Sequence, residues 1–227
     1  MKEGNENAKG VSYGGIRGIG AAIAEIFKVH GYEVSAPSHQ ELDLSDEKSI
    51  EKFIQSHQDV TYDVIINNAG INDINEIENV KDIEIDQMIA INLTAPIKLL
   101  RGFVGNMKQA QYGRIVNIGS IWGVVSKEGR CVYSATKNGI HGVTNTLAVE
   151  LAKYNILVNT VCPGFTLTEL TKKNNTAEEI KKISDEIPMG RMAEPKEIAQ
   201  VVYFLCSDDN TYLTGQKITV DGGYAER

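Results

Sequence analysis

The sequence has few of the residues that build disulfide frameworks or metal sites. Its three cysteines among 227 residues are widely spaced and odd in number. That usage fits reduced thiols in a cytosol better than a set of disulfide bonds. The four histidines are scattered without the spacing of metal ligands, so we expect no metal site.

Long apolar segments are also scarce. No apolar run approaches the roughly 18 residues that span a bilayer, and the first residues contain no apolar segment of the kind found in a signal peptide. Basic residues are outnumbered, with 23 Lys and Arg against 30 Asp and Glu, which gives a formal net charge of −7. This balance argues against nucleic acid or a membrane as the main partner. We therefore expect a cytoplasmic protein.

What the chain does contain is a regular alternation of short apolar strands and amphipathic helices. The expected strands cover residues 32–36, 63–67, 114–118, 156–161 and 216–220. The expected helices cover residues 19–30, 46–58, 84–108, 132–154 and 194–206, with Pro96 bending the third. This order predicts an α/β fold with three layers and a doubly wound parallel sheet. We find no repeats or linkers in the sequence, so residues 1–227 are expected to form a single domain.

One connection in this alternation is unusually short. Adjacent parallel strands need a crossover of about a dozen residues, and only five residues separate Ala36 from Leu42. We therefore predict that the helix between the second and third strands of such a fold is absent. The third strand, about Leu42, should then be vestigial or missing.

A glycine loop stands before the first helix. The spacing Gly14-x-x-x-Gly18-x-Gly20 is typical of a loop that holds a dinucleotide pyrophosphate. Gly14 allows a tight turn, Gly18 lets the backbone approach phosphate, and Gly20 lets helix and strand pack closely. The helix N-terminus then offers free N–H groups and a positive dipole to the anion. A second turn, residues 67–70, ends the most apolar strand at the edge where such sheets bind ligands.

The segment before the glycine loop, Lys9-Gly10-Val11-Ser12-Tyr13, is too polar for an ordinary central strand. A lysine and a glycine are costly there. One interpretation is a real but weakened strand, with poor stability at this edge of the site. The other is a shifted reading frame, because codons that can encode residues 7–14 also encode Met-Gln-Lys-Ala-Leu-Val-Thr-Gly one base later. Sequencing the encoding DNA distinguishes the two.

The catalytic candidates are Tyr133 and Lys137, which stand four residues apart on the expected helix 132–154 and so face the same way. Ser120 lies thirteen residues before Tyr133, at the end of an expected strand. A Tyr-x-x-x-Lys pair alone is common on solvated helix faces. In this order with Asn92, the turn at 67–70 and the glycine loop, it indicates an active site.

From Gly14 to Gly223 the chain resembles the short-chain dehydrogenase/reductase (SDR) family. Residues 187–224 are most similar to its single-domain 3-oxoacyl-[acyl-carrier-protein] reductase branch. The resemblance implies a Rossmann fold and the catalytic residues Asn92, Ser120, Tyr133 and Lys137. It implies cofactor binding by Gly14, Arg17, Gly18, Ile19, Gly20, Ser38, Asp43, Leu44, Asn68, Ala69, Gly70, Tyr133, Lys137, Pro163, Gly164, Thr166 and Thr168.

The mechanism that this resemblance implies passes a hydride between a nicotinamide and a carbonyl carbon, while Tyr133 exchanges a proton with the carbonyl oxygen. Lowering a tyrosine pKa by about three units takes roughly 4 kcal/mol. A lysine ammonium about 4 Å away, here Lys137, supplies that only where water is excluded. Ser120 would hydrogen-bond the substrate oxygen, and Asn92 would hold a water that links Lys137 to solvent.

We therefore expect an NAD(P)-dependent oxidoreductase that reduces a carbonyl to an alcohol, with a 3-oxoacyl thioester as the favoured substrate. A keto-sugar or other small-carbonyl reductase is the alternative, because the acidic charge disfavours docking of an acidic carrier protein. Gln111 and Tyr154, matched to basic residues near the site mouth in that branch, are not basic. A dinucleotide-sensing binding protein without turnover is a third possibility, disfavoured by the complete catalytic set.

Three further expectations concern the pocket, the cofactor and the assembly. The substrate pocket should be lined by Trp122, Val124, Val125, Phe165 and Leu170, with residues 165–187 forming a flexible lid. NADP(H) should be preferred over NAD(H), because the end of the second strand, about Ser38, lacks an acidic residue and Arg17 can reach a 2′-phosphate. The resemblance also implies a homotetramer or homodimer, through helix 132–154 and strand 216–220.

Overall fold

The computed structural model describes residues 8–226, which form one parallel sheet covered by helices. The sheet has six strands in the order β2-β1-β3-β4-β5-β6. The strands are β1 (Lys9–Tyr13), β2 (Glu33–Ser35), β3 (Val64–Asn67), β4 (Gly113–Ile118), β5 (Ile156–Pro163) and β6 (Lys217–Val220). The predicted α/β fold with a doubly wound parallel sheet is confirmed.

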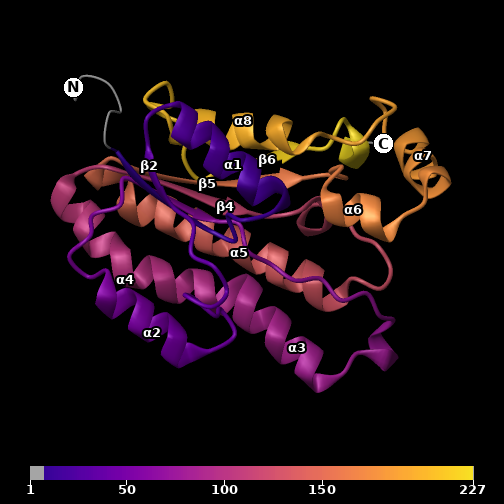
Figure 1. The fold of residues 1–227 in the computed structure, drawn as a ribbon, viewed down its shortest axis with the longest axis horizontal. Coiled ribbons are helices and arrows are strands. Elements are labelled where there is room, and N and C mark those ends of the chain that lie inside the picture. The colour runs from indigo at the N-terminus through magenta and orange to yellow at the C-terminus, as the bar shows by residue number, and fades with distance from the viewer. Residues whose placement is uncertain (1–7, 227) are drawn as a thin grey trace.

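The helices lie on both faces of this sheet. They are α1 (Gly18–Val29), α2 (Glu47–Ser56), α3 (Asp82–Ile89), α4 (Ala95–Ala110), α5 (Cys131–Leu151), α6 (Glu169–Asn174), α7 (Ala177–Asp185) and α8 (Pro195–Cys206). Figure 1 shows α1 and α8 over one face and α2, α4 and α5 over the other, with α6 and α7 at one end. The arrangement has the three layers predicted from the sequence.

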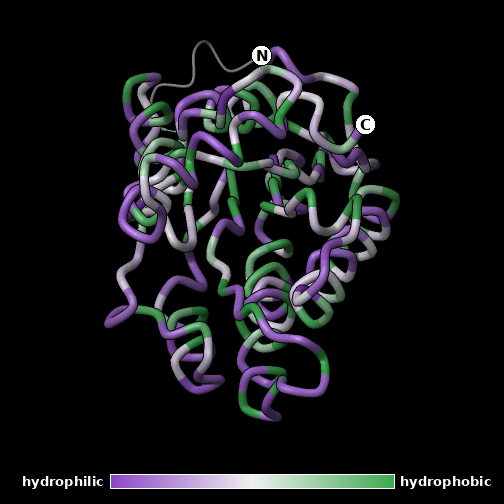
Figure 2. Tube along the Cα trace, turned by 90° about the vertical axis from the view of Figure 1, so that its right-hand side faces the viewer, coloured by the Kyte–Doolittle hydropathy of each residue, from purple (hydrophilic) through white to green (hydrophobic). Residues whose placement is uncertain are grey.

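Two hydrophobic cores, one on each face, hold the layers together. Because side chains alternate along a strand, Ile65 points into the core under α2, α4 and α5, whereas Val64 and Ile66 point into the core under α1 and α8. In Figure 2 hydrophobic and hydrophilic residues alternate along the helices, as expected for helices with one face on a sheet.

The short connection after β2 has the predicted consequence. Residues 36–46 form neither helix nor strand, so β2 is the free edge of the sheet, and Leu42 is instead buried in the core with α2 and α4. The predicted absence of the crossover helix and of the third strand is confirmed. Asp46 caps α2 by accepting a hydrogen bond from the Lys48 backbone N–H at 3.1 Å.

The polar segment before the glycine loop does form a strand, β1, and it lies between β2 and β3. Lys9 is exposed at its start, while Tyr13 packs edge-on against Phe53 with ring centroids 6.1 Å apart. The hydroxyls of Ser12 and Tyr13 are buried and have no hydrogen-bond partner among the described residues. This strand therefore carries two uncompensated polar groups. DNA sequencing is still the test that distinguishes the two interpretations of the segment.

The expected helix 84–108 is interrupted before its proline. A π-helical turn, η2 (Ala90–Thr94), joins α3 to α4, and Pro96 sits in the first turn of α4. Because the helix continues from η2 into α4, the missing N–H of Pro96 leaves one intrahelical hydrogen bond unmade. The irregular turn lies directly before this proline, at which the sequence predicted a bend. The joined helix Asp82–Ala110 is long and apolar enough to cross a membrane. Its buried residues share a core with β3, β4 and α5, so we interpret it as a core helix.

Candidate active site

The predicted site residues lie at the carboxyl ends of four neighbouring strands. Gly14 follows β1 and Gly70 follows β3. Ser120 follows β4, and Gly164 follows β5. Because these strands are parallel and adjacent, their carboxyl ends meet at one edge of the sheet, where open α/β sheets bind ligands.

The glycine loop is tight enough to require its glycines. Gly14 and Gly18 have positive φ angles of 79° and 53°. A Cβ at Gly20 would lie 2.2 Å from the Gly14 carbonyl oxygen, and the Asn68 side chain donates a hydrogen bond to that oxygen at 2.9 Å. A side chain at Gly20 would therefore push α1 away from the loop, as the sequence predicted.

The N-terminus of α1 is open to an anion. Arg17, its N-cap residue, is exposed and makes no side-chain capping bond, and the first turn, which includes Ile19, contains no acidic residue. Thr168 lies beside this end, with its Cγ2 atom 3.3 Å from where a Cβ of Gly18 would stand. The backbone N–H groups of the first turn are thus available to a pyrophosphate. We interpret the loop as a cradle that fits a dinucleotide.

Loops after β3 and β5 complete this cradle. The backbone N–H groups of Asn68 and Ala69 both donate to the Tyr13 carbonyl oxygen, which fixes their loop at the end of β1. After Pro163, the Gly164 N–H bonds to Val220 in β6. The Thr166 hydroxyl donates to the Gly164 carbonyl oxygen at 3.2 Å. These contacts bring the cofactor residues predicted from distant parts of the sequence to one site.

The adenosine end of the predicted site holds a carboxylate that the sequence reasoning did not use. Glu41 accepts a hydrogen bond from the Ser38 backbone N–H at 2.8 Å, and this bond lowers the Glu41 pKa. Asp43 accepts from the backbone and hydroxyl of Ser45 at 2.9 and 2.7 Å, while Leu44 is half-buried. The negative charge of Glu41 therefore lies beside Ser38, although Glu41 is three positions farther along the chain.

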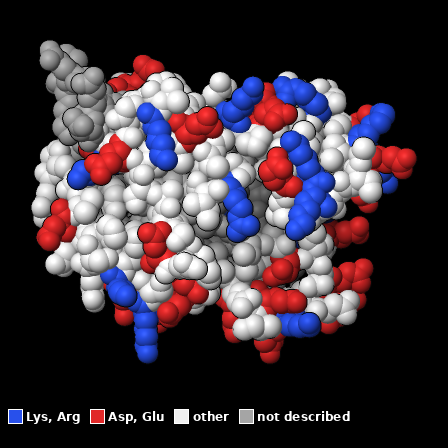
Figure 3. Space-filling model, in the orientation of Figure 1, with Lys and Arg blue, Asp and Glu red and all other residues white. Residues whose placement is uncertain are grey.

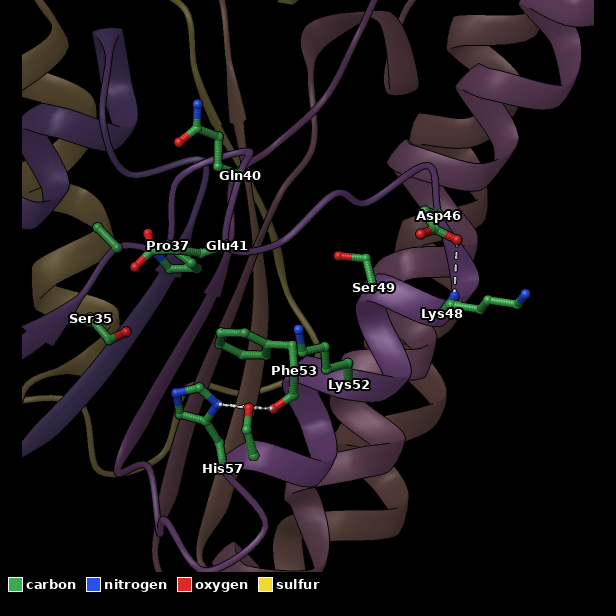
Figure 4. Close-up of a pocket in the computed structure, with 12 residues that line it drawn as sticks. Ser35, Pro37, Gln40, Glu41, Asp46, Lys48, Ser49, Lys52, Phe53 and His57 are labelled. Atoms are coloured by element: carbon green, nitrogen blue, oxygen red, sulfur yellow. Dashed lines mark hydrogen bonds between the residues drawn. The ribbon is translucent and has the colours of Figure 1, made fainter.

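A cavity of about 580 Å³ opens beside this segment, against the free edge of β2. Figure 4 shows Pro37 and Glu41 on one side of it and Ser49, Lys52 and Phe53 of α2 on the other. This is the side of the sheet from which the third strand is missing. The ribose end of a bound dinucleotide would be exposed to solvent here.

The catalytic candidates gather around Lys137, which is buried in the second turn of α5. Its Nζ atom donates to the Ile118 carbonyl oxygen at 2.7 Å and lies 5.6 Å from the centre of the Tyr133 ring. A Cβ at Gly70 would stand 3.4 Å from this Nζ and 3.2 Å from the Asn92 Oδ1 atom. Burial lowers the Lys137 pKa to about 8, because it disfavours the ammonium.

Asn92 sits in the π-helical turn and ties the loop after β3 to α5. Its Oδ1 atom accepts from the Ile71 N–H at 2.9 Å. Its Nδ2 atom donates to the Ile71 carbonyl oxygen at 2.8 Å and to the Thr136 hydroxyl at 3.2 Å. π-helical turns recur at functional sites. This positioning of the Ile71 loop is a role that the sequence did not indicate.

The hydroxyls of Tyr133 and Ser120, the residues predicted to act on the carbonyl oxygen, lie close enough to interact. Burial raises the Tyr133 pKa above its ordinary value, although the Ser120 hydroxyl and the Arg130 charge both lower it. The net direction is opposite to the lowering that the sequence reasoning expected from Lys137. The cause is that the buried phenolate loses more hydration than its neighbours replace. Ser120 accepts from the Trp122 N–H at 3.2 Å, which leaves its own proton to donate.

Three aromatic rings form the wall next to this pair. Trp122 meets Phe165 and Tyr224 edge-on, with centroids 6.0 and 5.9 Å away. Phe165 and Tyr224 are 5.2 Å apart. The sequence predicted Trp122 and Phe165 but missed Tyr224, which comes from the far end of the chain and is brought in by β6.

Two of the other three predicted pocket residues are more exposed than the three rings. Val124 is 42% exposed, Leu170 is 67% exposed, and Val125 is half-buried. Residues 165–187 contain α6 and α7, and Ile187 anchors their end in the interior. The mobility of this segment as a lid stays a prediction.

Gln111 and Tyr154 are far from where the sequence reasoning placed them. Gln111 follows α4 and comes just before β4, and Tyr154 comes just before β5. Both therefore lie at the amino ends of the strands, opposite the site. Their expected position near the site mouth is wrong, so they give no information about docking of a carrier protein.

Other titratable groups near the sheet are not suited to the chemistry. The Cys162 Sγ atom lies 3.8 Å from the His141 Nε2 atom, and both side chains are buried. Burial lowers the pKa of His141 to about 4 and raises that of Cys162 to about 11, so both are neutral at neutral pH. Within residues 8–226, no group of three or more His, Cys, Asp or Glu side chains is placed to hold a metal ion.

Comparisons with known proteins agree with this geometry. A family model described as "Enoyl-(Acyl carrier protein) reductase" matches residues 35–225. The 3-oxoacyl-[acyl-carrier-protein] reductase FabG of Vibrio harveyi is 34% identical over 230 residues, covering 92% of this chain and 94% of its own. The protein of the same name from Aquifex aeolicus is 36% identical over 235 residues, with coverage of 92% and 94%.

Solved structures match along nearly the whole chain. Aldohexose dehydrogenase of Thermoplasma acidophilum in ligand-free form has a TM-score of 0.92 and 27% identity, and covers 98% of this chain and 95% of its own. A structure of ElxO with NADPH bound has a TM-score of 0.91 and 28% identity, covering 97% of this chain and 100% of its own. The relatives thus include dehydrogenases and reductases with different substrates.

Proposed function

The chain belongs to the short-chain dehydrogenase/reductase family, and we propose that it is a cytoplasmic, NADP(H)-preferring reductase that converts a carbonyl to an alcohol. One observation carries the proposal. Tyr133, Lys137 and Ser120 converge at the carboxyl edge of the sheet, next to a glycine loop that a single Cβ at Gly20 would block. Sensing a dinucleotide requires the loop but not a proton donor beside it.

The cofactor would be held by the loop after β1 and by the turns after β3 and β5. When bound, it supplies the hydride. Gly14 and Gly18 let the backbone approach the pyrophosphate, and the N-terminus of α1 faces it. Gly70 leaves room for the ribose next to Lys137, because no side chain stands between them.

The chain's own residues would handle the proton. Tyr133 is neutral at neutral pH and donates its proton to the carbonyl oxygen, while the Ser120 hydroxyl donates a hydrogen bond to the same oxygen. The phenolate that results is stabilised by Lys137 and Arg130. Lys137 then returns a proton to Tyr133, which its pKa of about 8 suits.

A 3-oxoacyl thioester is the favoured substrate because the FabG proteins match over most of their length. Docking of an acidic carrier protein would need free basic residues. Lys172 and Lys181, near the site mouth, pair with Glu169 and Asp185 at 3.5 and 2.8 Å. Figure 3 shows basic and acidic side chains interspersed over this face. A keto-sugar or other small-carbonyl reductase is the second candidate, supported by the similarity to aldohexose dehydrogenase.

The preference for NADP(H) would come from Arg17, which is exposed at the N-terminus of α1. A charge-assisted hydrogen bond to a 2′-phosphate is worth roughly 1.5–3 kcal/mol. Glu41 acts against this preference, because its carboxylate is held beside Ser38. The two charges should have opposite effects on the choice between NADPH and NADH.

A homotetramer or homodimer would form through the outer faces of α4 and α5. A groove of about 750 Å³ between these helices is lined mainly by apolar residues, among them Leu100, Val104 and Leu147. At Gly105 and Gly142 an added Cβ would meet no atom within 4 Å, so a second helix pair could approach closely. This face matches the contact that the family resemblance implied for α5.

The direct test is a screen of carbonyl compounds with the purified protein and NADPH, following loss of the reduced cofactor by its absorbance. The panel should contain 3-oxoacyl thioesters, keto-sugars and small aldehydes and ketones. Turnover of a thioester above the others supports the favoured substrate, and turnover of a sugar supports the second candidate. Tight NADPH binding with no turnover of any class would favour a sensing protein and contradict the proposal.

A further inference from the structure

Arg130 is a half-buried cation, and the proposed reaction uses it only as a charge near the Tyr133 phenolate. It precedes α5 as its N-cap residue, three positions before Tyr133. Its Nε and Nη1 atoms are buried and have no hydrogen-bond partner anywhere in residues 8–226. Unpaired donors of a buried charge are costly, and native proteins keep them mainly where a ligand or function uses them.

The guanidinium faces the substrate side of the site. Its central carbon lies 5.8 Å from the centre of the Trp122 ring, the ring that also meets Phe165 and Tyr224. The charge of Arg130 also acts on the Tyr133 phenol. The group therefore lies near both the proton donor and the aromatic wall, where a substrate held by Tyr133 would extend.

We propose that Arg130 binds an anionic group, a carboxylate or a phosphate, on the carbonyl substrate, while Trp122 packs against the apolar part of that substrate. This inference rests on the proposed function and narrows its substrate class. A guanidinium presents parallel N–H groups that match two oxygens of such an anion. A free oxo acid would supply a carboxylate, and a phosphate-bearing carrier would supply a phosphate.

Lys127 provides a matched comparison. Its Nζ atom lies 5.6 Å from the same Trp122 ring, but the side chain is exposed to solvent. Water screens an exposed charge far more than a buried one. Removing Lys127 should therefore weaken anion binding much less than removing Arg130.

The test uses Trp122, the single tryptophan of the chain, as a fluorescent reporter. Benzoate, phenyl phosphate and neutral benzamide are titrated into the protein with and without NADP⁺. At least one anion should bind about tenfold or more tightly than benzamide. Arg130→Met should abolish that advantage while leaving benzamide affinity within about twofold, and Lys127→Met should retain it. Tighter binding of benzoate indicates a substrate carboxylate, and tighter binding of phenyl phosphate indicates a substrate phosphate.

Two controls separate the possible failures. Arg130→Lys keeps the charge without the paired N–H groups and should show an intermediate affinity, and thermal melts establish that each variant folds. Equal affinity for benzamide and both anions in the wild type, or an equal loss in Lys127→Met, overturns the inference. Turnover of 4-carboxybenzaldehyde against 4-formylbenzamide is measured separately. If the anions bind but neither aldehyde is turned over, the reductase proposal is contradicted, whereas anion binding by Arg130 is supported.

Discussion

Replacing Tyr13 by phenylalanine should stabilise this protein, although Tyr13 lies in a central strand. The side chain is 1% exposed, and its hydroxyl is one of the buried groups without a hydrogen-bond partner in the described chain. Burial also raises the pKa of this phenol. The ring itself packs well against Phe53, so the substitution keeps the packing and removes only the oxygen.

The size of the effect follows from the desolvation of one hydroxyl. A buried unsatisfied donor costs about 1–3 kcal/mol, so Tyr13→Phe should raise the free energy of unfolding by about 1–2 kcal/mol. For a chain of this length each kcal/mol corresponds to a rise in Tm of about 2–4 °C. Thermal and urea melts followed by circular dichroism measure both quantities.

Tyr62 is the matched control for this experiment. It is buried in the same core, but its hydroxyl is not among the buried groups that lack a partner, and the neighbouring Ser35 side chain lowers its pKa. Tyr62→Phe should therefore lower the free energy of unfolding by about 0.5–1.5 kcal/mol. If Tyr13→Phe destabilises the protein as much as Tyr62→Phe does, the reasoning about uncompensated groups in β1 is refuted.

Three further predictions use the same structure. Arg17→Ala should lower, and Glu41→Gln raise, the kcat/KM ratio of NADPH to NADH by about tenfold each; movement in the same direction contradicts the assignment. The pKa of His141 is about 4 in the folded protein and 6.5 ordinarily, so the unfolded chain takes up a proton more readily in this range. The free energy of unfolding should therefore fall as the pH drops from 6.5 to 4, and this fall should be smaller in His141→Gln. Gly142→Arg should yield folded protein of smaller mass by light scattering; an unchanged mass excludes this face as the interface.

The features predicted from the sequence are those fixed by local spacing. Tyr133 and Lys137 face one way because a helix turns every 3.6 residues. The glycine loop is recognisable because positive φ angles and close contacts require glycine. The missing third strand followed from chain length alone, since five residues cannot cross from one parallel strand to the next.

The features that were missed depend on packing between distant segments. Tyr224 reaches the pocket only because β6 pairs with β5 at the far end of the chain. Glu41 lies beside Ser38, at the predicted ribose site, because a turn returns its carboxylate to the Ser38 N–H. Arg130 is not marked out by any sequence pattern, because nothing in its neighbours predicts that two of its nitrogens are buried.

The measurement that tests the central claim most directly compares the wild type with Tyr133→Phe. Both are assayed for NADPH binding at equilibrium and for NADPH oxidation with the best carbonyl substrate of the screen. The substitution removes the proton and little packing, so NADPH affinity should stay within about threefold while turnover falls about a hundredfold or more. Turnover within a few fold of wild type would contradict the role of Tyr133 as the proton donor.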